Sequence, residues 1–140
     1  MVRSDGFSLL ELLLGLAVAA AVGGSAALQL PPVVATIRLT GTAYRLASAL
    51  RQARGHALEH NVRIDVRFDA TANGWEVSEV GGRPLLRERL PPGVVFQSLP
   101  ASRRVRFSTT GTADNATVVF AAGTRMRRVV VNQRGRVRVV

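Results

Sequence analysis

Two histidines and a glutamate near the middle of the chain have the spacing of zinc-peptidase ligands. In the segment HALEH, His56, Glu59 and His60 fit the pattern H-x-x-E-H, in which two histidines share one helix face and the glutamate assists the reaction. A catalytic zinc also needs a third protein ligand and a wall that excludes water, and little chain is left to build a substrate cleft. We therefore expect two solvated histidines, with no metal and no cofactor.

Nucleophilic catalysis has few candidate residues in this chain. The 140 residues include no cysteine and no lysine, and the serines have no evident base beside them. The lack of cysteine also excludes disulfides and thiolate metal sites. The composition therefore predicts a protein that is not an enzyme.

The C-terminal segment is strongly basic. All 19 basic residues are arginines, against nine acids, which gives the chain a formal net charge of +10. The segment from Thr124 to Val140 contains no acid and holds Arg125, Arg127, Arg128, Arg134, Arg136 and Arg138. Such a segment favours a partner that carries phosphates or anionic lipid.

Two of these arginines alternate in the segment RVRVV, which has the pattern of a strand. The side chains of Arg136 and Arg138 should lie on one face, about 7 Å apart, near the spacing of successive phosphates along a DNA strand. Gly135 would let the backbone turn tightly beside a ligand. One hypothesis is contact with phosphates; the other is an exposed strand face that charge keeps soluble and protects from edge pairing. Arg134 and Arg127 are further candidates for phosphate contact. If their strand lies nearby, the patch would also include Arg103, Arg104 and Arg106.

The N-terminal segment is apolar but contains one acid. From Phe7 to Leu28 the only formal charge is Glu11, and a helix of this length can cross a hydrocarbon core of about 30 Å. A carboxylate inside a membrane costs about 2.5 to 3.5 kcal/mol and normally has a partner. An α-amino group could be that partner if the chain were cut after Gly6. Alternatively, Glu11 lies at the membrane interface and favours the helix dipole.

The rest of the chain divides into a helical and a β-patterned part. Apolar residues recur every three or four positions from Thr36 to Asn61, which predicts an amphipathic helix. A glycine pair at 23–24 and a proline pair at 31–32 predict weaker helical regularity before it. Residues 62–140 predict seven or eight short strands. The fold class is therefore α+β: a long N-terminal helix, with a transmembrane half and an amphipathic half, packed on a small antiparallel β-sheet lobe.

Several motifs resemble one known family. The stretch Gly6-Phe7-Ser8-Leu9-Leu10-Glu11 resembles the class III signal of type IV pilins and type II secretion pseudopilins. The helix ending LASALRQARGHALEHN, the Trp75 strand, the segment VRFSTTGTADNATVVF and the closing GRVRVV are similar to the GspH/FimT group of minor pseudopilins and minor pilins. The resemblance implies a type IV pilin-like fold. Its parts would be a cleaved leader (1–6), a transmembrane and filament-core helix (7–30), an amphipathic helix (31–61) and a β-rich lobe (62–140).

The resemblance implies a structural subunit that helps to prime or cap a type II secretion pseudopilus or a type IV pilus. A prepilin peptidase would cut after Gly6 and methylate Phe7, and Glu11 would pair with the N-terminal amine of an adjacent subunit. The implied partners are other major and minor pilins or pseudopilins, the prepilin peptidase, and the inner-membrane assembly platform with its ATPase. The chain would cross the bacterial inner membrane once, with its lobe in the periplasm or in the filament.

The C-terminus supports an alternative function. The stretch Gly135-Arg136-Val137-Arg138 resembles a G-R-x-R element near the end of FimT-like pilins that are tied to DNA uptake. This implies a minor pilin of a transformation pilus that takes up double-stranded DNA. In a secretion pseudopilus, by contrast, the basic tail would be incidental or would face another subunit.

Overall fold

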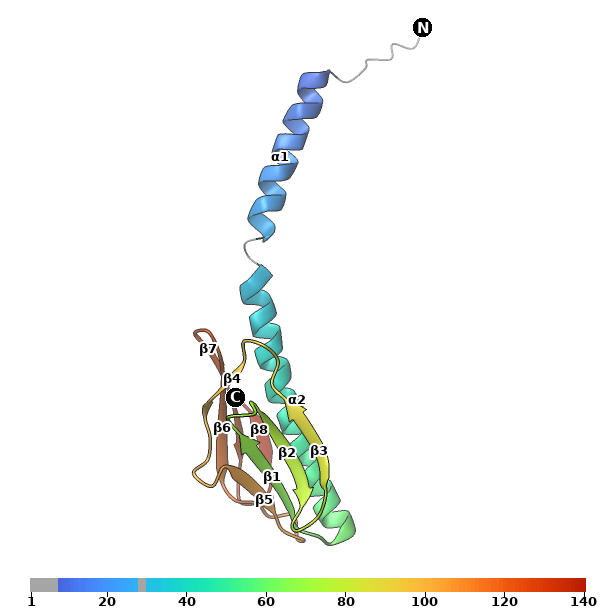
Figure 1. The fold of residues 1–140 in the computed structure, drawn as a ribbon, viewed down its shortest axis with the longest axis vertical. Coiled ribbons are helices and arrows are strands. Elements are labelled where there is room, and N and C mark those ends of the chain that lie inside the picture. The colour runs from blue at the N-terminus through green and yellow to red at the C-terminus, as the bar shows by residue number, and fades with distance from the viewer. Residues whose placement is uncertain (1–7, 28–29) are drawn as a thin grey trace. The chain divides into compact units, whose positions relative to one another are not determined.

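The computed structural model describes residues 8–27 and 30–140, and within them no side chains from 21 to 32. Helices α1 (Leu9–Ala27) and α2 (Leu30–His60) precede eight strands (Figure 1). The chain forms two compact units, divided between Val34 and Ala35. The strands are β1 (Ile64–Asp69), β2 (Gly74–Glu79), β3 (Pro84–Arg89), β4 (Val95–Ser98), β5 (Arg104–Phe107), β6 (Ala116–Ala122), β7 (Arg125–Val131) and β8 (Val137–Val139).

Helix α1 exposes its apolar side chains. Every leucine from Leu9 to Leu16 is more than half exposed. The backbone N–H of Glu11 donates to the carbonyl oxygen of Ser8 at 3.0 Å and to its hydroxyl at 3.2 Å, so Ser8 caps the helix start. In residues 8–27 and 30–140, no helix is both long and apolar enough to cross a membrane. The predicted leader and the Gly6–Phe7 cleavage site lie outside the described residues.

The glycine and proline pairs that predict weaker helical regularity lie within the two helices that the structure describes. The glycine pair at 23–24 is inside α1, and the proline pair at 31–32 is in the first turn of α2. A proline is accepted in the first turn because its missing N–H would have no helical partner there. Helix α2 therefore begins at Leu30, before the predicted start at Thr36.

The amphipathic part of α2 forms one wall of the core. Its stripe is buried, as the sequence spacing predicts, and consists of Leu39, Ala43, Leu46, Leu50, Ala53 and Ala57. Several of these residues are alanines, which let the helix approach the strands closely. The stripe and the inner faces of the strands form a single hydrophobic core.

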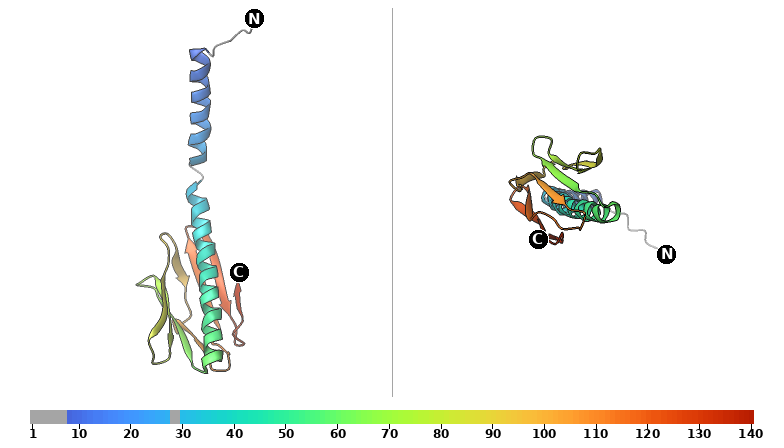
Figure 2. Two further views of the ribbon diagram at one scale, coloured as in Figure 1. Left: turned by 90° about the vertical axis from the view of Figure 1, so that its right-hand side faces the viewer. Right: turned by 90° about the horizontal axis from the view of Figure 1, so that it is seen from below.

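The eight strands form two antiparallel sheets of four strands each. Their orders are β3-β2-β1-β5 and β4-β6-β7-β8. In Figure 2 (left), β2 and β3 lie on one side of α2, and β7 and β8 lie on the other. Aromatic contacts join the two inner faces: the ring centroids of Trp75 and Phe120 are 6.4 Å apart, and those of Phe68 and Phe96 are 6.0 Å apart. The α+β prediction is confirmed, and the seven or eight predicted strands are eight in the described residues, divided between two sheets.

Candidate functional site

The C-terminal arginines lie around a closed turn between β7 and β8. Val130 of β7 is opposite Arg138 of β8. The N–H of Gly135 donates to the carbonyl oxygen of Asn132 at 2.8 Å, and the N–H of Arg136 donates to the Asn132 side-chain oxygen at 2.9 Å. These hydrogen bonds fix the direction in which the backbone leaves the turn at Arg136.

Gly135 is buried where the turn contacts the rest of the lobe. Its φ of +70° lies in the left-handed region, which L side chains rarely adopt. A Cβ atom at this position would lie 2.3 Å from the carbonyl oxygen of Gly111 and 2.7 Å from Nε of Arg54. The turn therefore packs this closely only with glycine at this position.

Two arginines of α2 hold the helix against this turn. Arg54 donates its Nε–H to the carbonyl oxygen of Gly111 at 3.0 Å, and Arg51 donates from Nη2 to the carbonyl oxygen of Val137 at 3.3 Å. Neither guanidinium pairs with a carboxylate in the described part of the chain. The backbone carbonyls orient the two groups but leave their charges unneutralised.

Helix and turn together form a basic cleft with a volume of about 380 Å³. We define the arginine cleft by its four charged residues, Arg51, Arg54, Arg136 and Arg138. The rest of its lining is Gly55, Leu58, Gly135 and Val137, so no acid lines it. The structure thus brings Arg136 and Arg138 of the predicted patch together, and adds two helix arginines that the sequence did not single out.

The other candidate arginines lie elsewhere. Arg134 is exposed in the turn, and Arg127 of β7 donates to the carbonyl oxygen of Met126. Arg104 begins β5, which belongs to the sheet of β1 to β3, and Arg103 precedes it in a turn with a φ of +49°. Because their strand is in the opposite sheet from β7 and β8, Arg103 and Arg104 do not extend the arginine cleft.

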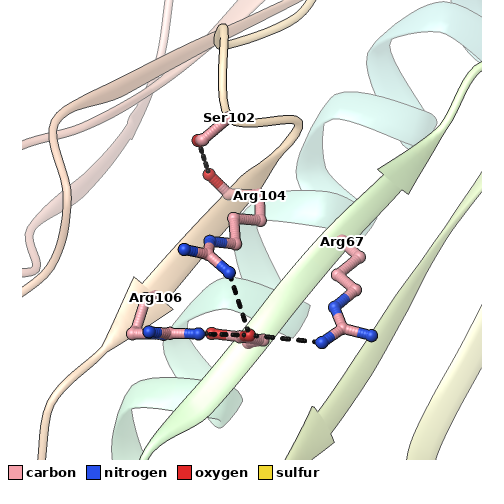
Figure 3. A network of polar contacts seen from close by, with 5 residues as sticks. Arg67, Ser102, Arg104 and Arg106 are labelled. Carbon is pink, nitrogen blue, oxygen red and sulfur yellow. Dashed lines mark hydrogen bonds and ion pairs between the residues drawn. The ribbon is translucent and has the colours of Figure 1, made fainter. Parts of the chain in front are cut away.

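Arg104 and its neighbours instead surround a buried carboxylate. Asp65 of β1 is fully buried, and Arg106 donates to its two oxygens at 2.6 and 2.9 Å (Figure 3). Arg67 and Arg104 approach the same carboxylate at 3.6 and 3.9 Å. The hydrogen bonds from Arg106 are the largest cause that lowers the pKa of Asp65, and the three positive charges add to them, while burial opposes them. We therefore assign this cluster a structural role.

Charge is segregated between the two sheets. In the described chain, every carboxylate that forms an ion pair belongs to β1, β2 or β3; the pairs include Arg45 with Glu88 at 3.1 Å and Arg87 with Glu76. From residue 115 to the C-terminus the chain has six arginines and no acid. The arginine cleft therefore lies beside the sheet whose strands contain no acid.

Of the two histidines predicted to be solvated, His60 is exposed, but His56 is half-buried and paired with an acid of the sheet. His56 contacts Glu79 of β2 at 2.9 Å, and the rings of His56 and His60 lie with centroids 4.2 Å apart. Across the described ranges, no group of three or more histidine, cysteine or acidic residues could hold a metal ion. His56 thus joins the end of α2 to the sheet.

The fold is that of a pilin-like subunit, in which a long N-terminal helix is packed on an antiparallel β lobe. A family model described as type II transport protein GspH matches residues 42–135. The chain therefore belongs to the GspH family of minor pseudopilins and minor pilins, as its motifs predict. The members of this family are structural subunits, which confirms that the protein is not an enzyme.

Solved structures share the same fold. The type IV minor pilin FimU of Pseudomonas aeruginosa superposes with a TM-score of 0.62 at 17% identity, covering 73% of this chain and 87% of that chain. The minor pseudopilin EpsH from the type 2 secretion system of Vibrio cholerae gives a TM-score of 0.63 at 13% identity, covering 74% and 96%. Among curated proteins, none matches the sequence. The family implies a filament at the membrane and periplasm, in association with other pilins.

Proposed function

We propose that the protein is a minor subunit that enters its filament through α1 and helps to prime or cap a type II secretion pseudopilus or a type IV pilus. The observation that carries this proposal is the surface of α1, which exposes leucines along its first half and bears the single charge of Glu11. Glu11 has no ionic partner in the described part of the chain. Such a helix has an apolar packing surface and one charge that needs a partner from elsewhere.

Processing would supply that partner. In this proposal a prepilin peptidase cuts after Gly6 and methylates Phe7, so that the mature chain begins four residues before Glu11. Four residues are about one helical turn, which lets the amine of an adjacent subunit lie near the carboxylate. Before assembly, α1 is held in the inner membrane and the lobe lies in the periplasm, where the assembly platform and its ATPase act on the subunit.

Replacing Glu11 with alanine tests this role. The full chain should be recovered with filaments sheared from the host bacterium, whereas Glu11→Ala should be recovered about tenfold less or not at all, because the amine of the neighbouring subunit would be left unpaired in an apolar surrounding. The matched control is Glu59→Ala, which removes an exposed acid from α2. Equal recovery of Glu11→Ala and the parent chain would rule out the assembly role of Glu11.

A second function for the lobe is supported by the arginine cleft: contact with double-stranded DNA in a transformation pilus. Arg136 and Arg138 lie in a cleft without acids, where they can bind backbone phosphates but read no bases. Few aromatic residues accompany the arginines, so stacking on single-stranded bases is not expected. Duplex DNA is therefore the ligand that we propose for the cleft.

Salt-dependent binding tests this second function. The full chain in a non-ionic detergent should bind random-sequence duplex DNA with a Kd of about 10⁻⁴ to 10⁻⁶ M or tighter, and Arg136→Gln/Arg138→Gln should bind about tenfold more weakly with a shallower salt dependence. The control is Arg83→Gln/Arg89→Gln, which removes two exposed arginines beside and on β3. No binding at low salt, or equal losses in both variants, would contradict DNA contact at the cleft.

A further inference from the structure

Two residues of α2 contribute half of the charge in the arginine cleft. Arg51 and Arg54 are three positions apart, so they lie on the same face of the helix. Arg51 donates to the carbonyl of Val137, the first residue of β8, and Arg54 donates to the carbonyl of Gly111 in the loop beside the β7–β8 turn. The cleft therefore has a helix wall and a turn wall, each with two arginines.

Each helix arginine keeps most of its hydrogen-bonding capacity. A guanidinium has five N–H donors, and each of these two uses one on a backbone carbonyl. The contact fixes the orientation of the side chain, which reduces the entropy lost when a ligand binds. The remaining donors can bind an oxygen-rich anion, and four like charges with no acid among them favour such an anion electrostatically.

Other arginines of α2 differ in their surroundings. Arg45 pairs with Glu88 at 3.1 Å, so its charge is balanced by sheet residues. Arg38 donates to the carbonyl oxygen of Pro92 at 3.4 Å, a contact like that of Arg51, but it lies away from the arginine cleft. These two residues are matched controls, because they are on the same helix and carry the same charge.

We propose that Arg51 and Arg54 are phosphate-binding residues, so that a phosphodiester of duplex DNA is held between α2 and the β7–β8 turn. This inference rests on the proposed contact with duplex DNA and adds the helix wall to it. A phosphate on the outer strand face would meet Arg136 and Arg138 alone, whereas a phosphate in the cleft meets arginines from both walls. The two arrangements predict different effects of removing the helix arginines.

The test compares double variants of the full chain in non-ionic detergent, titrated with random-sequence duplex DNA over a salt series. Arg51→Gln/Arg54→Gln should weaken binding about tenfold or more and reduce the slope of log K against log salt by about 0.9 for each lost phosphate contact. Arg38→Gln/Arg45→Gln should weaken binding less than about threefold, because neither residue lines the arginine cleft and only the long-range field in the cleft changes. Thermal melts of every variant check that the lobe remains folded.

A second variant keeps the proposal testable if the helix double variant does not fold. Arg54 also supports the Gly111 loop beside Gly135, so the helix double variant could unfold. Arg51→Gln removes only a 3.3 Å contact with the Val137 carbonyl and should still weaken binding about threefold or more, with a smaller salt slope. Combining Arg51→Gln with Arg136→Gln/Arg138→Gln should cost less than the sum of the separate losses, because both walls contact the same phosphate.

The outcomes separate the two proposals. If the parent chain binds DNA and Arg136→Gln/Arg138→Gln weakens it, but Arg51→Gln and the helix double variant bind like the Arg38→Gln/Arg45→Gln control, the helix wall is overturned and DNA contact at the turn stands. If the parent chain does not bind DNA even at low salt, DNA contact fails and the helix wall fails with it. If DNA binding weakens in the variants of the turn wall and of the helix wall but not in the Arg38→Gln/Arg45→Gln control, both DNA contact and the helix wall are supported.

Discussion

Replacing Gly135 with alanine should lower the free energy of unfolding by about 2 to 5 kcal/mol. A left-handed backbone costs a residue with a Cβ about 1 to 2 kcal/mol, and Gly135 has a φ of +70°. The new Cβ would also lie 2.3 Å from the carbonyl oxygen of Gly111. That oxygen is backbone and accepts the hydrogen bond of Arg54, so relieving the overlap moves the helix contact and costs about 1 to 3 kcal/mol more.

The chain provides a matched control for the Gly135 substitution. Gly123, between β6 and β7, has a φ of +60°, and a Cβ added there would meet no atom within 4 Å beyond its chain neighbours. Gly123→Ala should therefore lose only the backbone cost of about 1 to 2 kcal/mol. Unfolding in urea can be followed by the fluorescence of Trp75, which is the single tryptophan and is buried. Equal losses in the two variants would show that the turn does not pack tightly against Gly111 and Arg54.

Replacing Asp65 with asparagine should lower the free energy of unfolding by about 3 kcal/mol at neutral pH. The carboxylate is fully buried, and removing its charge leaves three arginines around a neutral group. The control is Glu76→Gln, which breaks the more exposed pair with Arg87 on the same sheet and should cost less than about 1 kcal/mol. A loss for Asp65→Asn no larger than that of the control would contradict a structural role for this cluster.

The stability that Asp65 contributes should depend on pH. Arg106 holds the pKa of Asp65 below its ordinary value of 3.8, so the folded protein binds this proton less readily than the unfolded chain. The contribution of Asp65 is therefore complete above about pH 5 and decreases as the pH falls through 3.8 toward the folded pKa. The difference in unfolding free energy between the parent chain and Asp65→Asn should shrink over this range. A difference that stays constant or grows on acidification would contradict the lowered pKa.

Local periodicity was sufficient to predict most elements of this fold. The spacing of Leu39, Leu46 and Leu50 placed the buried stripe of α2, and the run ATVVFAA coincides with β6. Periodicity could not predict which strands pair, because alternation defines the two faces of a strand but not its neighbours. Hence the division into two sheets, with β5 beside β1, emerged only in the structure.

The sequence predicted the turn wall of the arginine cleft but not its helix wall. Alternation placed Arg136 and Arg138 near each other, and both line the arginine cleft. Arg51 and Arg54 are more than 80 residues before Arg136 in the sequence. Their helical spacing shows that they share one face of the helix, but it does not show which part of the lobe that face contacts. Asp65 lies on the polar side of an alternating strand, which predicts exposure; it is buried because arginine side chains from β1 and β5 cover it.

The N-terminal mass of the protein in filaments tests the central claim most directly. Mass spectrometry of the chain recovered from sheared filaments should show a species that lacks residues 1–6 and begins at N-methylated Phe7. Filaments that contain the chain with Met1 to Gly6 intact, or filaments that contain their major subunit but none of this chain, would contradict its assignment as a processed filament subunit.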